Sequence, residues 1–98
     1  MIRGTTPTHT FKVNVNLSNA EVIYLTYKQG DKVTIEKTKE DMEITPTTIS
    51  VRLTQEDTLA FTKASVEVQI RARFSDGTAI ASNIMRATSE RILKNGVI

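Results

Sequence analysis

The chain has 98 residues, with 13 lysines and arginines against 11 aspartates and glutamates, and it contains no cysteine. This length predicts a single domain, and the lack of cysteine excludes disulfides, thiolate nucleophiles and thiolate metal ligands in either an oxidising or a reducing compartment. The formal charge of +2 has its two signs interspersed, which favours solubility over a polyanionic partner, and no apolar run predicts a signal peptide or a membrane span.

An extended lead-in is predicted for residues 1–7, because Pro7 fixes its own φ and biases Thr6 toward extended geometry. The first strand is predicted from Thr8 to about Leu17, where every second side chain is apolar. These apolar positions are Phe11, Val13, Val15 and Leu17.

The second strand, over residues 21–28, has apolar side chains on both faces. Val22 and Tyr24 interleave with Ile23, Leu25 and Tyr27. Such a strand is either central and covered on both sides, or it uses one face in an oligomer contact. We therefore take Val22, Tyr24 and Tyr27 as candidate protein-interface residues.

A glycine-containing loop at residues 29–31 leads into a third strand, and the charged run at residues 36–41 is expected to be exposed. Met42 and Ile44 predict a short edge strand that Pro46 ends. The apolar residues that alternate along the third strand and along a further strand over residues 48–54 are Val33, Ile35, Ile49, Val51 and Leu53.

Thr54 is a helix N-cap residue followed three positions later by Asp57, which predicts a short helical crossing near residues 55–61. Residues 65–78 then form the clearest strand of the chain, ending in Asp76-Gly77, a pair typical of a two-residue hairpin turn. Its alternating apolar residues are Val66, Val68, Ile70, Ala72 and Phe74.

The return strand covers residues 78–82, and residues 84–93 fit either a strand or a helix. We favour a strand to about Ser89 because the preceding elements are all β. The domain is therefore expected to span residues 8–94, followed by a frayed C-terminus at residues 95–98.

About seven short strands with one helical crossing predict an all-β fold, a small antiparallel two-sheet sandwich of immunoglobulin-like type. The cysteine and tryptophan landmarks of antibody domains are missing, so the prediction concerns the architecture and not that family. A small barrel is the alternative.

Catalytic patterns are missing. His9 is the only histidine and is expected to be a partly exposed residue at the end of a strand rather than a general base. The carboxylates do not follow the order of a calcium loop, so they are expected to be solvated charge. These are Glu40, Asp41, Glu43, Glu56 and Asp57. We predict no enzyme, no catalytic residue, no cofactor and no metal site.

A basic sheet face is the one feature that suggests nucleic acid, because Arg52, Arg71 and Arg73 can share an outward face with Lys12. Single-strand binders also place aromatic residues on such a face, whereas the three phenylalanines all fall in the predicted core phase. Cross-strand salt bridges are the expected use of these charges, with no nucleic-acid partner.

Four stretches carry a family resemblance, together with the charged hairpin between them. They are Thr10–Val13, Leu53–Thr58, Val68–Ile70 and Phe74–Thr78. In these stretches the chain, from Thr8 to about Ser89, resembles the N-terminal β domain of phage baseplate upper proteins. It also looks like small uncharacterised prophage proteins of Gram-positive gut bacteria.

The resemblance implies a non-enzymatic structural or assembly module of a phage or prophage virion, in the tail or baseplate, that acts through protein–protein packing. Its partners would be virion structural proteins and further copies of itself, with no membrane. It would be made in the bacterial host cytoplasm and then become part of the virion. A carbohydrate-binding or adhesin-like β-sandwich is the alternative.

Overall fold

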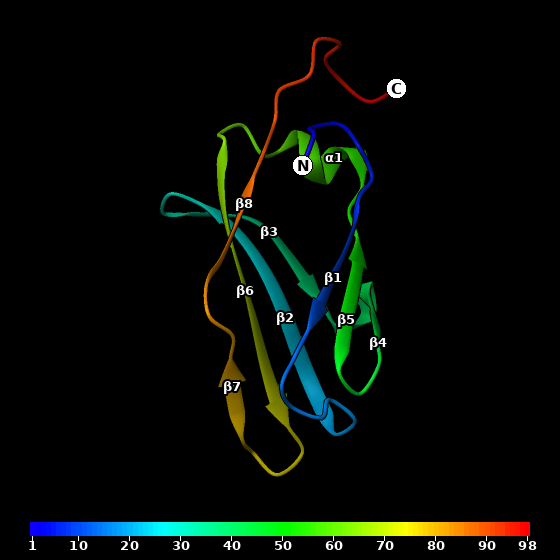
Figure 1. The fold of residues 1–98 in the computed structure, drawn as a ribbon, viewed down its shortest axis with the longest axis vertical. Helices are drawn as coiled ribbons and strands as arrows, with labels where there is room; N and C mark the ends of the chain where they lie inside the picture. Colours follow the sequence, from blue (N-terminus) through cyan, green and yellow to red (C-terminus); the bar gives the residue numbers. More distant parts are fainter.

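Two antiparallel sheets pack face to face in the computed structural model, which describes all 98 residues (Figure 1). The small sheet has the order β1 (Thr8–Lys12), β5 (Thr48–Arg52), β4 (Met42–Ile44). The large sheet has the order β3 (Lys32–Thr38), β2 (Ala20–Gln29), β6 (Ser65–Phe74), after which β7 (Ala79–Ala81) and β8 (Met85–Thr88) share one edge of β6. Two short helical elements connect the sheets: η1 (Lys39–Asp41) and α1 (Gln55–Leu59).

The predicted immunoglobulin-like sandwich is confirmed, with eight strands instead of about seven. In such sandwiches one sheet has the order A, B, E, D and the other contains C′, C, F, G. The small sheet matches B, E and D as β1, β5 and β4, and the large sheet matches C′, C, F and G as β3, β2, β6 and the β7–β8 edge. No strand of the structure lies beside β1 in the position of strand A.

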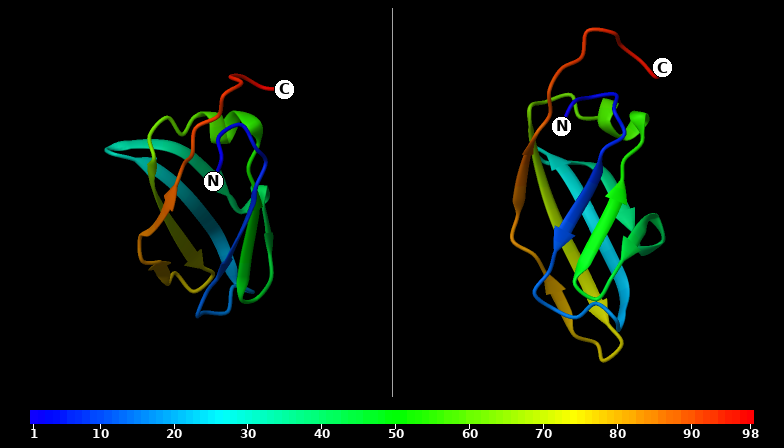
Figure 2. Two further views of the ribbon diagram at one scale, coloured as in Figure 1. Left: turned by 45° about the horizontal axis from the view of Figure 1, so that its top comes forward. Right: turned by 45° about the vertical axis from the view of Figure 1, so that its right-hand side comes forward.

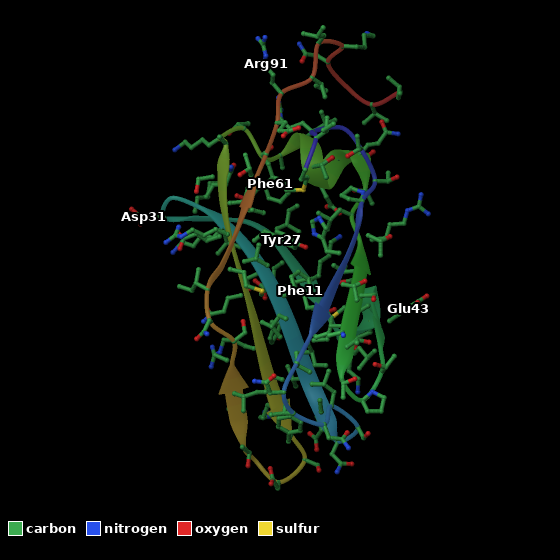
Figure 3. The ribbon with its side chains drawn as sticks, in the orientation of Figure 1. Phe11, Tyr27, Asp31, Glu43, Phe61 and Arg91 are labelled. Atoms are coloured by element: carbon green, nitrogen blue, oxygen red, sulfur yellow. The ribbon has the colours of Figure 1, made fainter.

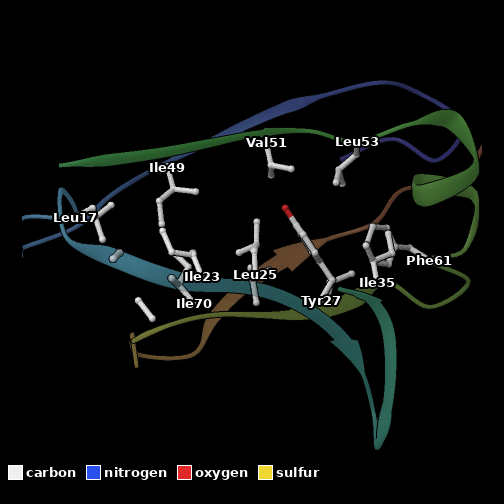
Figure 4. Packing of buried hydrophobic residues seen from close by; sticks show 14 residues of the cluster. Leu17, Ile23, Leu25, Tyr27, Ile35, Ile49, Val51, Leu53, Phe61 and Ile70 are labelled. Atoms are coloured by element: carbon white, nitrogen blue, oxygen red, sulfur yellow. The ribbon is translucent and has the colours of Figure 1, made fainter. Parts of the chain in front are cut away.

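The core lies between the two sheets (Figure 4), and the paired strands β2 and β6 contribute most of its buried residues from the large sheet. Leu25 on β2 is paired with Ile70 on β6, and both are buried. The opposite wall comes from three residues of the small-sheet side, Ile49, Val51 and Leu53, which are all buried as predicted. Alternation along each strand therefore places the apolar set inward, and the hydrophobic effect holds the sheets together.

The helical crossing is confirmed as α1. Thr54 and Asp57 form a capping box, in which the Thr54 Oγ1 accepts from the Asp57 N–H at 3.1 Å and the Asp57 carboxylate accepts from the Thr54 N–H at 2.9 Å. The prediction that Asp57 is solvated charge is wrong, since its carboxylate also binds the Lys37 ammonium at 2.8 Å. Burial alone would raise the pKa of Asp57, but the hydrogen bonds from Lys37 and Thr54 hold it below its ordinary value.

The first strand is shorter than predicted. β1 ends at Lys12 because β5 begins at Thr48, so only one further bond, from the Val13 N–H to the Thr47 carbonyl, extends the pairing. Val15, expected on the core face, is 36% exposed.

The hairpin after β6 also differs from the prediction. The Phe74 N–H donates to the Thr78 carbonyl at 2.8 Å, which leaves a three-residue loop rather than a two-residue turn. Only Gly77 has positive φ, and the Asp76 carboxylate accepts from the Thr78 N–H at 2.9 Å. These are features of a type I turn followed by a glycine bulge.

Residues 84–93 contain the strand β8, as favoured from the sequence, and it ends at Thr88. Beyond it, Met1–Arg3 run parallel to residues 88–90, with the Arg3 N–H donating to the Glu90 carbonyl at 3.0 Å. Gln55 exchanges two hydrogen bonds with Ile98, and both chain ends lie at the same end of the sandwich (Figure 2). No helix of the structure has the length and apolar character needed to cross a membrane.

Replacing Leu25 by alanine should lower the free energy of unfolding by about 2–5 kcal/mol, because it leaves a cavity in the fully buried centre of the core. Thr26→Ala, on the outer face of the same strand, is the matched control and should cost less than about 1 kcal/mol. Urea unfolding followed by circular dichroism measures both. Equal losses for the two variants would contradict the assignment of faces on β2.

Candidate protein-interaction surfaces

The outer face of the large sheet carries two of the three predicted interface residues. Val22 is half-buried and Tyr24 is 41% exposed, although both lie near the middle of the sheet. Tyr24 is flanked by Thr38 on β3 and Arg71 on β6, and Val22 by Arg73. A shallow hollow of about 220 Å³ is lined by Val22, Tyr24, Arg71, Ala72, Arg73 and Ala79. We call this surface the Tyr24 face.

The interpretation of β2 as a strand covered on both sides is therefore wrong, because nothing in the chain covers Tyr24. An oligomer or partner contact on the Tyr24 face stays a prediction. Tyr27 does not belong to this surface, since odd-numbered residues here point to the opposite side of the strand and Tyr27 is fully buried.

The basic residues do not share one face. Arg71 and Arg73 project from the large sheet, whereas Lys12 and Arg52 project from the small sheet on the other side of the sandwich. The Arg73 Nη2 lies 3.6 Å from the Glu21 Oε2, and both side chains are more than half exposed, so this ion pair contributes little to stability.

Tyr27, labelled in Figure 3, reaches across from the large sheet and bonds to His9 of the small sheet. The Tyr27 hydroxyl lies 2.6 Å from the His9 Nδ1, and the Tyr27 ring also contacts Phe61, with ring centres 5.6 Å apart. His9 is the second residue of β1 and is partly exposed, as predicted, and it lies on the inner side of the strand next to Phe11.

Burial shifts both groups toward their neutral forms. Burial and the positive charge of the amino terminus lower the pKa of His9. Burial and the carboxylate of Asp57 raise the pKa of Tyr27 well above its ordinary value. The pair is therefore a neutral hydrogen bond that satisfies a buried hydroxyl.

A long opening separates β1 from the β7–β8 edge, and we call it the seam. Two hollows of about 690 and 320 Å³ line it, and each is bordered by residues of both sheets. Its apolar lining includes Phe11, Val13, Ile80, Met85 and Ala87, and its only charged lining residues are Lys12 and Arg86. No pattern in the sequence indicates the seam, because its walls come from segments about 70 positions apart that only the fold brings together.

No three histidine, aspartate or glutamate side chains are grouped so that they could hold a metal ion. No protein-family model, no curated protein and no solved structure matches this chain. Function therefore has to be inferred from the surfaces of the fold and from the resemblance in the sequence.

His9 should make stability depend on pH in a range where few other groups titrate. Its pKa is lower in the folded state than in the unfolded chain, so the unfolded state binds more protons. The free energy of unfolding should be fully retained above about pH 6.5 and should fall as the pH decreases below that value.

His9→Gln keeps a polar partner for Tyr27 and removes the titration. Its urea midpoint should stay constant between about pH 7 and pH 5.5, where carboxylates remain charged and wild-type stability declines. The same slope in both proteins would show that His9 is not the titrating group.

Proposed function

We propose that the chain is a non-enzymatic structural or assembly module of a phage or prophage virion, in its tail or baseplate, that acts by packing against other virion proteins. The virion part of this proposal rests on the resemblance of residues 8–89 to the N-terminal β domain of baseplate upper proteins. The packing part rests on one observation, the uncovered Tyr24 in the middle of the large sheet.

The composition of the Tyr24 face supports a protein partner. Tyrosine and arginine are enriched among the residues that dominate binding energy, and they act from positions surrounded by other contacts that exclude water. Val22 and Arg71 are neighbours of Tyr24 on this face, and the shallow hollow beside these residues could take up a side chain of the partner. The free energy gained on burial grows with the apolar area removed from water, and an aromatic ring has a large area. A partner that covers Tyr24 would therefore gain much of its binding energy there.

A carbohydrate-binding module is less well supported. Such a module normally exposes aromatic rings, and of the two tyrosines only Tyr24 is exposed, because Tyr27 lies in the core bonded to His9. A single ring in a shallow hollow offers a sugar few of the directed polar groups that small-molecule sites provide.

The genes beside the coding sequence give the first test. Neighbouring capsid or tail genes would support a virion role, and a metabolic operon would overturn it. Tail and baseplate proteins encoded there are then the probes for a binding experiment.

Val22→Asp combined with Tyr24→Asp should abolish co-purification with the neighbouring structural protein that binds the wild type, because it removes the two apolar side chains that the partner would cover and adds two charges to the contact. Val33→Asp is the matched control. Val33 is also on the outer face of the large sheet and 50% exposed, but it lies at the opposite end, beside Lys28. Co-purification that survives Val22→Asp/Tyr24→Asp, or that Val33→Asp abolishes equally, would remove the Tyr24 face as the contact.

A further inference from the structure

The small sheet has two unpaired edges. Along an antiparallel pair of strands, hydrogen-bonded residue pairs alternate with pairs that are not hydrogen-bonded. The Leu53 N–H donates to the Pro7 carbonyl and the Val13 N–H to the Thr47 carbonyl, so the odd-numbered residues of β1 are the ones bonded to β5. The N–H and C=O groups of Thr8, Thr10 and Lys12 therefore point away from β5, toward the seam.

The other edge is β4. The Thr45 N–H donates to the Thr48 carbonyl at 3.0 Å, so Glu43 is bonded to β5 and the backbone groups of Ile44 point outward. β1 and β4 are both antiparallel to β5, so they run in the same direction on its two sides.

The edges carry opposite charge. On the β1 side, Lys12 is the charged residue of the strand, while Arg86, the other charged residue that lines the seam, lies on β8 and pairs with Glu67 at 3.7 Å. On the β4 side, Glu40, Asp41 and Glu43 are all exposed, and Figure 3 shows Glu43 projecting from this edge of the molecule. Neither Lys12 nor Glu43 forms an ion pair within the chain.

We propose that the β1 edge binds the β4 edge of a second copy of this chain. The β4 strand of one copy would pair in parallel with β1 of the next, in the place that strand A takes in a complete sandwich. Parallel pairing follows because a copy placed alongside in the same orientation presents β4 running in the direction of β1.

If the second copy lies at the same height along the strands, the unpaired charges of Lys12 and Glu43 come together. Ser50 on β5 faces Thr10 on one side and Glu43 on the other, so these residues lie at one height in the sheet. A second copy at the same height places its Glu43 beside Thr10 and diagonal to Lys12, a spacing that long side chains can bridge. The second copy also covers the apolar side chains of the seam.

A contact between two different edges is head-to-tail. It generates a ring if the rotation between copies closes and a filament if it does not. It does not involve the Tyr24 face, which lies on the outer side of the other sheet and stays free for a different partner.

Sedimentation velocity of the full chain over a range of protein concentrations tests the pairing. We expect association in about 0.01 M salt, where the Debye length is about 30 Å, and weaker association in about 1 M salt, where it is about 3 Å. A wild-type protein that stays monomeric at every concentration in low salt would overturn the proposal.

Charge exchange makes the test specific. Lys12→Glu and Glu43→Lys should each weaken self-association at least about tenfold, because each places like charges at the contact. An equimolar mixture of the two variants should associate again, since each then finds the opposite charge on the other. A mixture that remains monomeric, with both variants folded by circular dichroism, would contradict a head-to-tail contact.

Thr10→Pro separates strand pairing from charge attraction alone. It removes an N–H that points away from β5, so it spares the pairing within the chain, and Thr10→Val is the control that keeps this donor. Association should be lost in Thr10→Pro and kept in Thr10→Val. A Thr10→Pro protein that associates like the wild type would show that the edges do not pair through their backbones.

The two proposals fail separately. Val22→Asp/Tyr24→Asp should self-associate like the wild type, whatever it does to binding of neighbouring virion proteins. Loss of self-association in that variant would assign the contact between copies to the Tyr24 face and would overturn the pairing of β1 with β4.

Discussion

The antiparallel pairing of β2 with β6 is the interaction on which the other elements depend. These two ten-residue strands are the longest of the chain, and every other strand of the large sheet pairs with one of them. Their register also decides which side chains face the core, because a shift of one residue would invert both faces. Tyr24 is exposed and Tyr27 is buried as a direct consequence of this register.

Burying Tyr27 introduces a polar group into an apolar core, and this explains the position of His9. An unpaired hydroxyl at this depth would cost about 1–3 kcal/mol, and His9 on β1 of the small sheet supplies the partner. The single histidine, which by residue type would be the first candidate for catalysis, is thus used to join the sheets. Its lowered pKa has a structural cause and does not by itself indicate catalysis.

The sequence predicted what depends on alternation and local hydrogen bonds: the core residues of β5 and β6, the capping box at Thr54 and the two-sheet fold. The sequence-based predictions were wrong where the length of a strand or loop depends on its pairing partner. Alternation continues to Leu17, but β1 ends at Lys12 for lack of a partner strand, and the Asp76-Gly77 pair forms a longer loop than its residue types suggest.

The candidate interface was predicted in part, because apolar residues on both faces of β2 indicate contacts on both sides without showing whether those contacts are internal. The seam was not predictable, since its walls meet only in the folded chain.

Short strands and charged residues at a sheet edge are commonly devices against aggregation, and both occur here, in the three-residue β4 and in Lys12 on β1. Protection against every neighbour would be achieved by the same charge on both edges, because any two copies would then repel. The small sheet has a basic β1 edge and an acidic β4 edge instead, so two β1 edges repel, two β4 edges repel, and only unlike edges attract. With the proposed pairing of β1 and β4, this arrangement would suppress disordered association and leave one direction of growth, which is what a subunit of a ring or a filament requires.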